Sequence, residues 1–486
     1  MTETCPAPLM LFNSLTRQTE AFAPVHPGEA RVYSCGPTVY NFQHIGNMRA
    51  YIFADTLGRV LSWKGYTLTH VINITDVGHL TSDADAGDDK MEKAASEAGK
   101  SAWDIAKHFT QAYWADIDRL NIRQPAKWSI ATDHIEAMID FAKSIADKHC
   151  YELDSGLYFD TATVPDYGSL ARAATDEGES RIDPVEGKRH ATDFAIWRKT
   201  PAGETRQMEW ESPWGKGAPG WHLECSVMSK MYLGEHFDIH TGGIDHREIH
   251  HPNEIAQNQA HSCSADTGAN IWMHNNFLVD RAKDGKSAKM SKSAGEFLTL
   301  QWLVDKGVHP LAYRLMCLQA HYRSELEFSW DNLMAALTRL KRLAMTIEQL
   351  RNDGDPTDPE HPRLLELLAA FDETVSDDLN TPKALTVLDE MLAQKKIDKS
   401  QRLAAVAAMD EVFGLELGTL SRADLRVRPA AATISEDEIE HHLDLRQQAK
   451  RDKNFPAADA IRDTLTEQGV EIMDGDPLRW EWKIEA

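Results

Sequence analysis

The chain has 486 residues, of which 42% are hydrophobic and 26% charged. This composition fits a globular protein of roughly two to four domains. Its formal charge of −24 argues against a protein that binds nucleic acid over its whole surface, although a local basic patch can still contact phosphates. No segment is apolar enough to span a bilayer and the first residues lack a secretory signal, so we expect no membrane association. Six cysteines without close pairing predict reduced thiols and a cytoplasmic protein.

A first amphipathic helix is predicted from His44 to Trp63, directly after a strand at residues 31–35. His44, Gly46 and Asn47 therefore lie where a strand leads into a helix N-terminus, and free backbone N–H groups and the helix dipole favour anions there. Gly46 leaves room for a flat ring near the backbone, while His44 and Asn47 can donate hydrogen bonds to phosphate oxygens. Alone, an H-x-G-N motif is more often structural than catalytic.

Two lysines lie close together in residues 289–293 (KMSKS), after a predicted strand at residues 276–279. The residues around them are Gly, Ser and Lys, which do not favour a rigid element, so we expect Lys289 and Lys292 to lie on a mobile loop. Mobile ammonium groups suit a polyphosphate whose charge changes during a reaction. An isolated K-x-x-K run is usually a solvated basic turn, so this motif does not assign a function by itself.

Four side chains of the types that bind metals follow predicted strands or begin predicted helices. His250 and Glu254 are four residues apart on a predicted helix, so they project from one face and can chelate zinc. Cys35 ends the first predicted strand, and Cys225 lies near the start of another helix. Because parallel strands bring their carboxyl ends to one edge of a sheet, the four side chains can meet there. Alternatively, each cysteine is a small buried hydrophobe and the His/Glu pair lies on the surface.

Taken together, these motifs resemble a known family. The pair HIGN (residues 44–47) and KMSKS (residues 289–293) is similar to the two ATP-binding motifs of class I aminoacyl-tRNA synthetases. The segments YSCGPTVY, GWHLECS and HHPNEIAQ resemble the cysteinyl-tRNA synthetase family, and the likeness extends over essentially the whole chain. One departure is Asn47, because the commoner first motif ends in a histidine; the asparagine is neutral and cannot donate a proton as an acid.

The resemblance implies a single zinc ion per chain, held by Cys35, Cys225, His250 and Glu254, that binds the sulfur of a substrate cysteine. This use of zinc is physically reasonable because shape alone separates cysteine from serine by only a few kcal/mol. Zinc holds a thiolate as a soft ligand, whereas a serine hydroxyl stays neutral and coordinates weakly. Such selection needs no editing domain.

The resemblance also assigns roles to further positions. It implies that the catalytic residues are His44, Asn47, Lys289 and Lys292. Those that contact ATP are Gly46, Gly243, Asp245 and Lys292. Those that form the pocket for cysteine are Cys35, Gly36, Thr75 and Trp221. The acidic segment 77–90 has no implied role beyond a loop, and a metal site there is the less favoured alternative.

The fold implied is α/β: a doubly wound, Rossmann-type parallel sheet forms the catalytic core and carries a connective insertion, followed by a helical bundle and a small C-terminal anticodon-binding domain. In chain order we expect the first half of the core at 1–122, the insertion that receives the tRNA acceptor end at 123–218, the second half of the core at 219–287, the KMSKS loop and stem-contact region at 288–330, the helical bundle at 331–425 and the anticodon-binding domain at 439–486. In the last, Phe455 is expected to stack on a base, and Asp459 and Asp474 to accept hydrogen bonds from base edges.

The implied activity is an ATP-dependent ligase that joins L-cysteine to the 3′ end of cysteine tRNA through cysteinyl-adenylate. Its partners are then tRNA(Cys), L-cysteine and ATP with Mg²⁺, and we expect a monomer. One alternative is a cysteine ligase that acts on an amino sugar, but the basic and aromatic pattern at residues 446–474 counts against it. The other is an inactive tRNA-binding or zinc-sensing paralogue, which the intact Lys289 and Lys292 disfavour.

Overall fold

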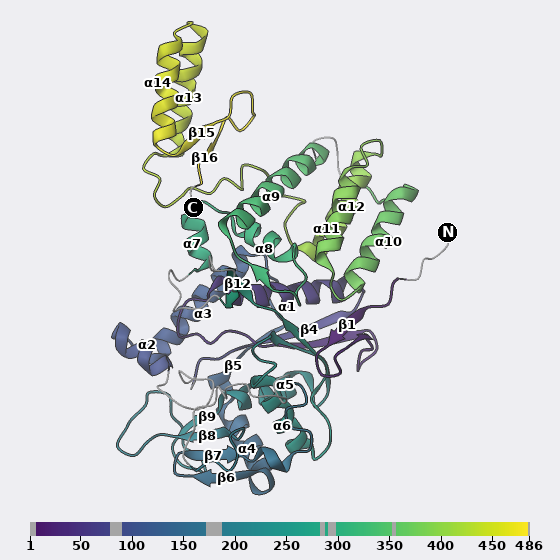
Figure 1. The fold of residues 1–486 in the computed structure, drawn as a ribbon, viewed down its shortest axis with the longest axis vertical. Helices are drawn as coiled ribbons and strands as arrows, with labels where there is room; N and C mark the ends of the chain where they lie inside the picture. Colours follow the sequence, from purple (N-terminus) through teal and green to yellow (C-terminus); the bar gives the residue numbers. More distant parts are fainter. Residues whose placement is uncertain are drawn as a thin grey trace.

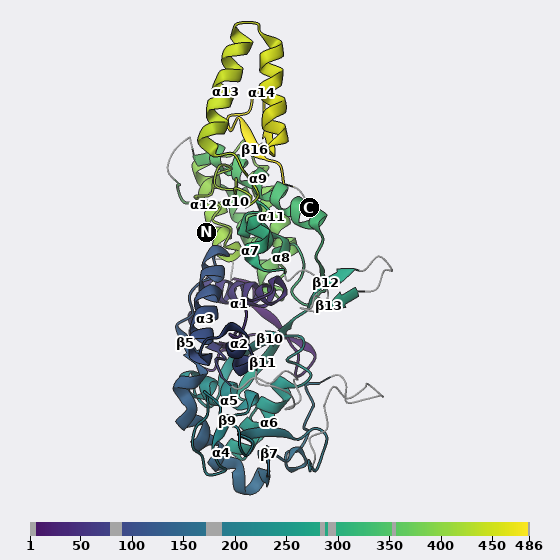
Figure 2. The same cartoon turned by 90° about the vertical axis from the view of Figure 1, so that its left-hand side faces the viewer.

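The computed structural model describes residues 6–77, 90–171, 187–281, 287–289, 298–351 and 356–484. The molecule is elongated, with a small antiparallel sheet at one end and a pair of long helices at the other (Figures 1 and 2). The largest sheet and its helices lie between these ends. Within the described residues, none of the helices is both long and apolar enough to cross a membrane.

The central sheet has five strands, all paired in parallel. Across the sheet the strands are β11 (Ala269–Asn275), β10 (Phe237–Gly243), β3 (Glu29–Ser34), β4 (Thr67–Ile74) and β5 (Lys127–Ile130). The chain runs outward from β3 to β5 on one side and from β10 to β11 on the other, so the strand order reverses between β3 and β10. Ligands bind at such a reversal in doubly wound sheets. The predicted α/β fold class is thus confirmed. One difference is that β5 belongs to the central sheet although it follows Ile122, where we expected the first half of the core to end.

Helix α1 (Ile45–Trp63) follows β3 and begins one residue after His44, in line with the sequence prediction. The Nδ1 atom of His44 accepts a hydrogen bond from the backbone N–H of Gly46, so His44 caps the helix. Almost the whole middle of α1 is buried, because the helix lies between the sheet and the helical bundle (Figure 1). The other helices of the core region are α2 (Lys90–Ala98), α3 (Ala102–Arg119), α4 (Ile135–His149), α5 (Trp221–Leu233) and α6 (His250–Ser262).

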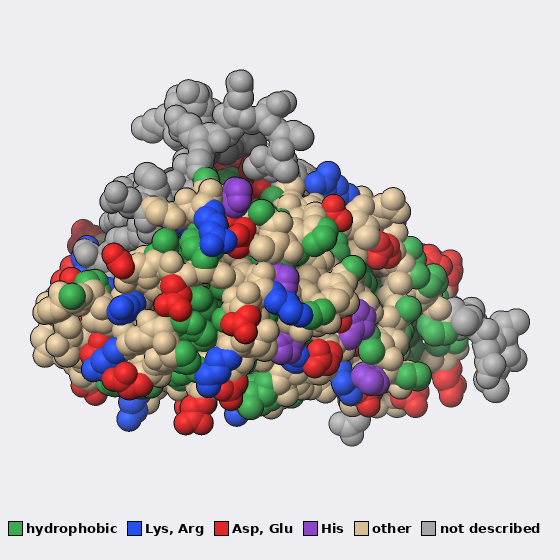
Figure 3. Space-filling view, turned by 90° about the horizontal axis from the view of Figure 1, so that it is seen from below, with side chains coloured by type: hydrophobic (Ala, Val, Ile, Leu, Met, Phe, Trp, Pro, Cys, Tyr) green, Lys and Arg blue, Asp and Glu red, His purple; other side chains and the backbone are tan. Residues whose placement is uncertain are grey.

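An insertion separates the two halves of the central sheet and forms its own four-stranded antiparallel sheet. Its strands are β6 (Cys150–Leu153), β7 (Gly156–Phe159), β8 (Phe194–Lys199) and β9 (Gly217–Pro219). Seen from this end of the molecule, acidic and basic side chains are interspersed, with several histidines among them (Figure 3). The described part of this face is therefore of mixed charge.

The second half of the chain is mainly helical, as predicted. A three-stranded sheet comes first, with β12 (Leu278–Arg281), β13 (Ser287–Lys289) and β14 (Leu326–Glu327). The helices are α7 (Leu300–Asp305), α8 (Pro310–Leu318), α9 (Trp330–Arg351), α10 (Pro362–Ser376), α11 (Thr381–Leu392), α12 (Lys399–Phe413), α13 (Glu436–Arg451) and α14 (Phe455–Glu467). The hairpins are β1 (Met10–Asn13) with β2 (Gln18–Ala21), and β15 (Val470–Ile472) with β16 (Trp480–Trp482).

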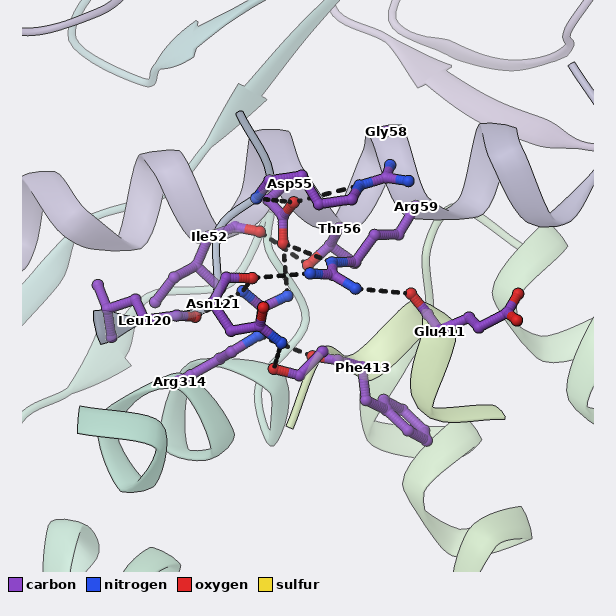
Figure 4. A network of polar contacts seen from close by, with 12 residues as sticks. Ile52, Asp55, Thr56, Gly58, Arg59, Leu120, Asn121, Arg314, Glu411 and Phe413 are labelled. Atoms are coloured by element: carbon purple, nitrogen blue, oxygen red, sulfur yellow. Dashed lines mark hydrogen bonds and ion pairs between the residues drawn. The ribbon is translucent and has the colours of Figure 1, made fainter. Parts of the chain in front are cut away.

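A buried group of charges joins α1 to the helical bundle (Figure 4). The carboxylate of Asp55 accepts hydrogen bonds from Arg59 at 2.7 Å and from Arg314 of α8 at 2.6 Å. Arg314 is fully buried and also donates to the carbonyl oxygen of Phe413, at the end of α12. Arg59 donates to the carbonyl oxygen of Glu411 in the same helix. One carboxylate thus anchors two guanidinium groups that hold the catalytic core against the bundle.

Replacing Asp55 by Asn should destabilise the protein strongly, because two buried guanidinium groups would lose their charge partner. Breaking a buried pair in this way costs about 3–5 kcal/mol. The apparent melting temperature, followed by circular dichroism at pH 7, should fall by several degrees. The matched control is Glu366→Gln, which removes an exposed partner of Arg363 and should leave the melting temperature almost unchanged.

The effect of Asp55→Asn should also depend on pH. Burial opposes the charged form, but Arg314 and Arg59 outweigh it and lower the pKa of Asp55. The stabilisation is therefore complete above the ordinary aspartate pKa of about 4 and is lost as the pH falls further. The difference in melting temperature between parent and variant should shrink below that pH. A constant difference down to pH 3 would contradict a stabilising charge on Asp55.

Candidate active site and metal centre

A cavity of about 360 Å³ lies at the carboxyl ends of β3, β4, β10 and β11, beside the N-terminus of α1. This is the position where the strand order reverses. The predicted site residues that line it are Cys35, Gly36, His44, Gly46, Asn47, Thr75, Trp221, Cys225, Gly243, Asp245 and His250. The structure thus brings the two halves of the predicted site together in one cavity.

On the side of the cavity next to α1, the first backbone N–H groups of the helix already donate within the protein, that of Ile45 to Leu298 and that of Asn47 to His44, so they are not the free groups that the sequence suggested. The backbone of Ile45 is held by the hydroxyl of Tyr313, which donates to its carbonyl oxygen at 2.6 Å. The side-chain amide of Asn47 donates to Gln43 at 3.2 Å, and both residues line the cavity. Gln43 was not found by sequence reasoning, because it lies outside the H-x-G-N motif.

Two glycines let the backbone come close to its neighbours at this site. A Cβ atom on Gly36 would lie 1.8 Å from the carbonyl oxygen of Asn73, and its N–H donates to the Asn73 side chain at 2.7 Å. A Cβ atom on Gly243 would lie 2.4 Å from Oδ1 of Asp245. Neither position tolerates a side chain without movement of the neighbouring backbone or carboxylate.

The four predicted metal ligands come together beside the cavity, which Cys35, Cys225 and His250 line. The ligand atoms of Cys35, Cys225, His250 and Glu254 all lie within 4.8 Å of one another, and all four residues are buried. Oε1 of Glu254 lies 3.0 Å from Nε2 of His250 but makes no hydrogen bond of good geometry among the described residues. Two ligand atoms that point at a common ion would have this arrangement. The cluster can therefore bind a metal.

The electrostatics of the cluster also suit a cation. Burial raises the pKa of both thiols, Cys35 and Cys225, so these groups need a positive partner to become thiolates. Burial opposes the charged form of His250 as well, but Glu254 and Cys225 outweigh it and raise its pKa to about 10. For Glu254, His240 and His250 outweigh burial and lower the pKa to about 2.

The structure contains a second possible metal-binding group, with two histidines that were not predicted from the sequence. Cys35 and Glu254 also form a possible metal-binding group with His240 and His251. Nε2 of His251 lies 3.3 Å from Sγ of Cys35, and its Nδ1 atom lies 2.8 Å from Nε2 of His274. His240 sits in the middle of a buried strand, where periodicity gives no signal. His251 follows His250 directly in the sequence, and this doublet was the available clue.

The wall of the cavity near the metal ligands contains Thr75 and Trp221. The hydroxyl of Thr75 donates to Glu224 at 2.9 Å, and burial raises the pKa of this carboxyl to about 8. The indole of Trp221 packs against the imidazole of His250, with ring centroids 4.2 Å apart. Glu224 was also missed, although it lies next to Cys225 in the sequence.

The predicted lysines are only partly within the described residues. Lys289 ends β13, and its backbone lies opposite Val279 of β12. Lys292 and most of the acidic segment, residues 78–89, lie outside the described residues.

Comparison with known proteins agrees with the sequence motifs. The family model for the "tRNA synthetases class I (C) catalytic domain" matches residues 21–338. A Cysteine–tRNA ligase of Novosphingobium aromaticivorans is 67% identical, with 98% of this chain and 97% of the relative covered. Another of Zymomonas mobilis is 54% identical, with 99% and 98% covered, and one of Thermococcus gammatolerans is 36% identical, with 98% and 99% covered.

Among solved structures, the fold is similar to that of a Mycobacterium tuberculosis methionyl-tRNA synthetase bound by methionyl-adenylate. The TM-score is 0.53 at 15% identity, and the match covers 79% of this chain and 90% of the other. This likeness supports the fold alone, whereas the sequence matches extend over nearly the full length of the chain. The chain therefore belongs to the cysteinyl-tRNA synthetase family of class I aminoacyl-tRNA synthetases.

Proposed function

We propose that this protein is a cysteine–tRNA ligase, which activates L-cysteine with ATP and transfers it to the 3′ end of tRNA(Cys). The observation that carries the proposal is the identity of 67% and 54%, over almost the whole chain, to relatives of that name. The cavity adds chemical support, because a group of possible metal ligands that includes two thiols lies near the N-terminus of α1.

In the first step, the cysteine carboxylate attacks the α-phosphorus of ATP, and pyrophosphate leaves as cysteinyl-adenylate forms. His44 and Asn47 line the cavity at the start of α1, where they are positioned to donate hydrogen bonds to phosphate oxygens as negative charge develops. Gly46 and Gly243 leave room for the nucleotide, and Asp245 can accept hydrogen bonds from ribose hydroxyls. In the second step, a terminal ribose hydroxyl of the tRNA attacks the carbonyl carbon of cysteinyl-adenylate, the bond from that carbon to the phosphate oxygen breaks, and AMP leaves. No covalent enzyme intermediate is needed, so catalysis rests on positioning and charge stabilisation.

The metal proposed for the cluster is zinc, with Cys35, Cys225, His250 and Glu254 as ligands. Two thiols, an imidazole and a carboxylate are a donor set that suits zinc. When bound, zinc supplies a soft Lewis acid that favours the thiolate of cysteine over the hydroxyl of serine. His222 lies 2.9 Å from Nδ1 of His250 and can fix the orientation of that ring. Thr75 and Trp221 complete the pocket for the amino acid.

The remaining parts of the chain are proposed to bind tRNA. The insertion, expected at 123–218, would receive the acceptor end, and the C-terminal domain, expected at 439–486, would read the anticodon. The aromatic ring proposed for stacking, Phe455, has 59% of its surface exposed. Asp474 accepts hydrogen bonds from Arg446 at 2.6 and 2.9 Å and from Lys450 at 2.9 Å, so its carboxylate is held in one orientation.

The two alternative functions are less favoured. A cysteine ligase for an amino sugar has no use for an anticodon-reading domain, yet the named relatives match the chain from end to end. An inactive tRNA-binding paralogue has no need to keep four possible ligand residues converging on one point, and a zinc-sensing one has no need of Lys289 and Lys292.

Exchange of pyrophosphate into ATP is the direct test of the first step. Labelled pyrophosphate should enter ATP when cysteine is present and at least a hundredfold more slowly with serine, because a hydroxyl is a weak zinc ligand. Charging of tRNA(Cys) should then follow on addition of the tRNA. Exchange that is equally fast with serine would refute selection through the thiol. Normal exchange without any charged tRNA would instead favour the amino-sugar ligase.

Replacing Cys225 by Ser should remove the metal and weaken cysteine binding while ATP binding persists, because a serine hydroxyl replaces one of two thiolate ligands. Zinc content by elemental analysis and the KM for cysteine in the exchange assay measure this. The matched control is Cys263→Ser, the same change at an exposed cysteine that ends α6. Full zinc content in the Cys225 variant would show that the proposed ligand set is wrong, and would favour the group containing His240 and His251.

Replacing Lys292 by Ala should lower the maximal rate of exchange by about a hundredfold, which is typical for the loss of one group that stabilises transition-state charge. Affinity for ATP, measured separately by equilibrium binding, should change much less. Lys289→Ala should have the smaller effect on the rate, and Lys283→Ala serves as the control from the same stretch of sequence. Equal rates for the Lys292 variant and the parent would remove Lys292 from the catalytic groups.

A further inference from the structure

A single buried arginine joins the start of α1 to two other segments of the chain. Arg49 is the fifth residue of α1 and has 2% of its surface exposed. Its guanidinium donates hydrogen bonds to four backbone carbonyl oxygens. Nη1 donates to those of Asn276, at 2.9 Å, and Phe277, and Nη2 donates to those of His321, at 3.3 Å, and Ser324, at 2.6 Å. Arg49 thus holds both segments against the same helix.

The first of these segments is the base of the hairpin that leads to the predicted lysine loop. Asn276 and Phe277 lie between β11 and β12, and both line the cavity of the candidate active site. Strand β12 lies beside α1 and pairs with β13, so that Val279 lies opposite Lys289 (Figure 2). Because Lys289 is the first residue of KMSKS, the position of the hairpin determines where this motif begins.

The second segment holds the base of the hairpin as well. The backbone N–H of Asn276 donates to the carbonyl oxygen of Tyr322 at 2.8 Å, and its side-chain amide donates to that of Arg323 at 3.0 Å. The side chains of Tyr322 and Arg323 both donate to the carboxylate of Asp378, which precedes α11, at 2.6 Å. The base of the hairpin is therefore fixed between α1 and a segment that is itself anchored to the helical bundle.

An arginine is the side chain that this arrangement requires. Each of its two terminal nitrogens carries two N–H groups in a fixed plane, and each nitrogen donates to two carbonyl oxygens here. Glu325 acts on Arg49 at longer range, and within the described part of the chain no carboxylate lies at ion-pair distance from it. Burying a charge without such a partner is costly, and an apolar side chain would avoid that cost. Packing alone therefore does not explain an arginine at this position.

We propose that Arg49 is a positioning residue for the formation of cysteinyl-adenylate. It keeps the base of the hairpin at a fixed separation from His44 and Asn47, so that the two predicted ATP motifs act on the same nucleotide. This role rests on the proposed function. Asn276 and Phe277 line the cavity and are held by Arg49, which therefore acts through them rather than on the substrates. Placement matters for such groups, because a misplacement of about 1 Å can lower a rate by about a hundredfold.

The test replaces Arg49 by Lys or by Gln in the full-length protein and measures cysteine-dependent exchange of pyrophosphate into ATP. Lys keeps the charge but loses the planar fork, whereas Gln keeps one NH₂ group without the charge. Either change should lower the maximal rate by about tenfold to a hundredfold. The KM for cysteine and the zinc content should stay close to those of the parent, because the predicted metal ligands lie on other elements.

Arg351→Lys is the matched control. The guanidinium of Arg351 also donates to two backbone carbonyl oxygens, those of Gly418 at 3.1 Å and Leu420 at 2.8 Å, but these follow α12 in the helical bundle. The maximal rate should therefore stay at the parent value. An unchanged rate in folded Arg49→Lys and Arg49→Gln proteins would refute the positioning role. Absence of exchange in the parent would instead refute the proposed function.

A double-mutant cycle with Lys292→Ala separates positioning of the lysine loop from a general loss of stability. If Arg49 acts by placing that loop, Arg49→Lys should lower the rate by less than about threefold when Lys292 is already absent. Arg49→Gln takes its place in the cycle if the Lys variant does not fold, because Gln buries no charge. The same loss of rate in both backgrounds would overturn the proposal. A Lys292→Ala protein that exchanges as fast as the parent would do so too, because the position of this loop would then not matter.

Discussion

The parallel pairing of β3 with β10 is the constraint on which the site depends. These strands are about 200 residues apart in the sequence, yet Tyr33 lies opposite His240 and Ser34 opposite Thr241. The backbone N–H of Cys35 extends the pairing by donating to the carbonyl oxygen of Thr241 at 3.0 Å. This register places Cys35 next to the buried carboxyl end of β10. Helix α6, which follows β10, then brings His250 and Glu254 to the same point.

The register of the strands does not by itself position α1. The N-terminus of this helix must also stay at the edge of the sheet, next to the cavity. Two contacts from α8 achieve this, one in the first turn of α1 and one near its middle. Tyr313 holds the carbonyl oxygen of Ile45 in the first turn, and Arg314 holds Asp55 further along. Because these are neighbouring residues of α8, the start and the middle of α1 are tied to the same helix. The bundle thus forms part of the support for the active site.

Local motifs made much of this architecture predictable. The strand, the turn and the helix around His44 are encoded within about thirty consecutive residues, so periodicity was sufficient to place them. The full ligand set followed from the resemblance to the family, because the positions of the four residues alone left a surface pair and two buried cysteines as the alternative. The partnership of Arg314 with Asp55 was not predictable, because the two residues are 259 positions apart and each alone looks like an ordinary charge. His240 and Glu224 were missed for a related reason, since a polar residue within a buried segment leaves no periodic signal. Strand β5 was placed outside the first half of the core because four residues give too short a pattern.

The cluster of buried titratable groups beneath the cavity explains why a cation and the substrate thiol suit the same place. Burial raises the pKa of Cys35 and Cys225, so two neutral thiols would be the stable state if nothing positive were bound. Under the proposed function, a divalent cation held by these residues would reverse this preference. The thiol of a substrate cysteine behaves like the protein thiols, because the cation stabilises its deprotonated form as well. A serine hydroxyl, with a much higher pKa, cannot lose its proton at comparable cost. The environment that makes free thiolates unfavourable in this pocket is therefore the one that makes metal binding selective for sulfur.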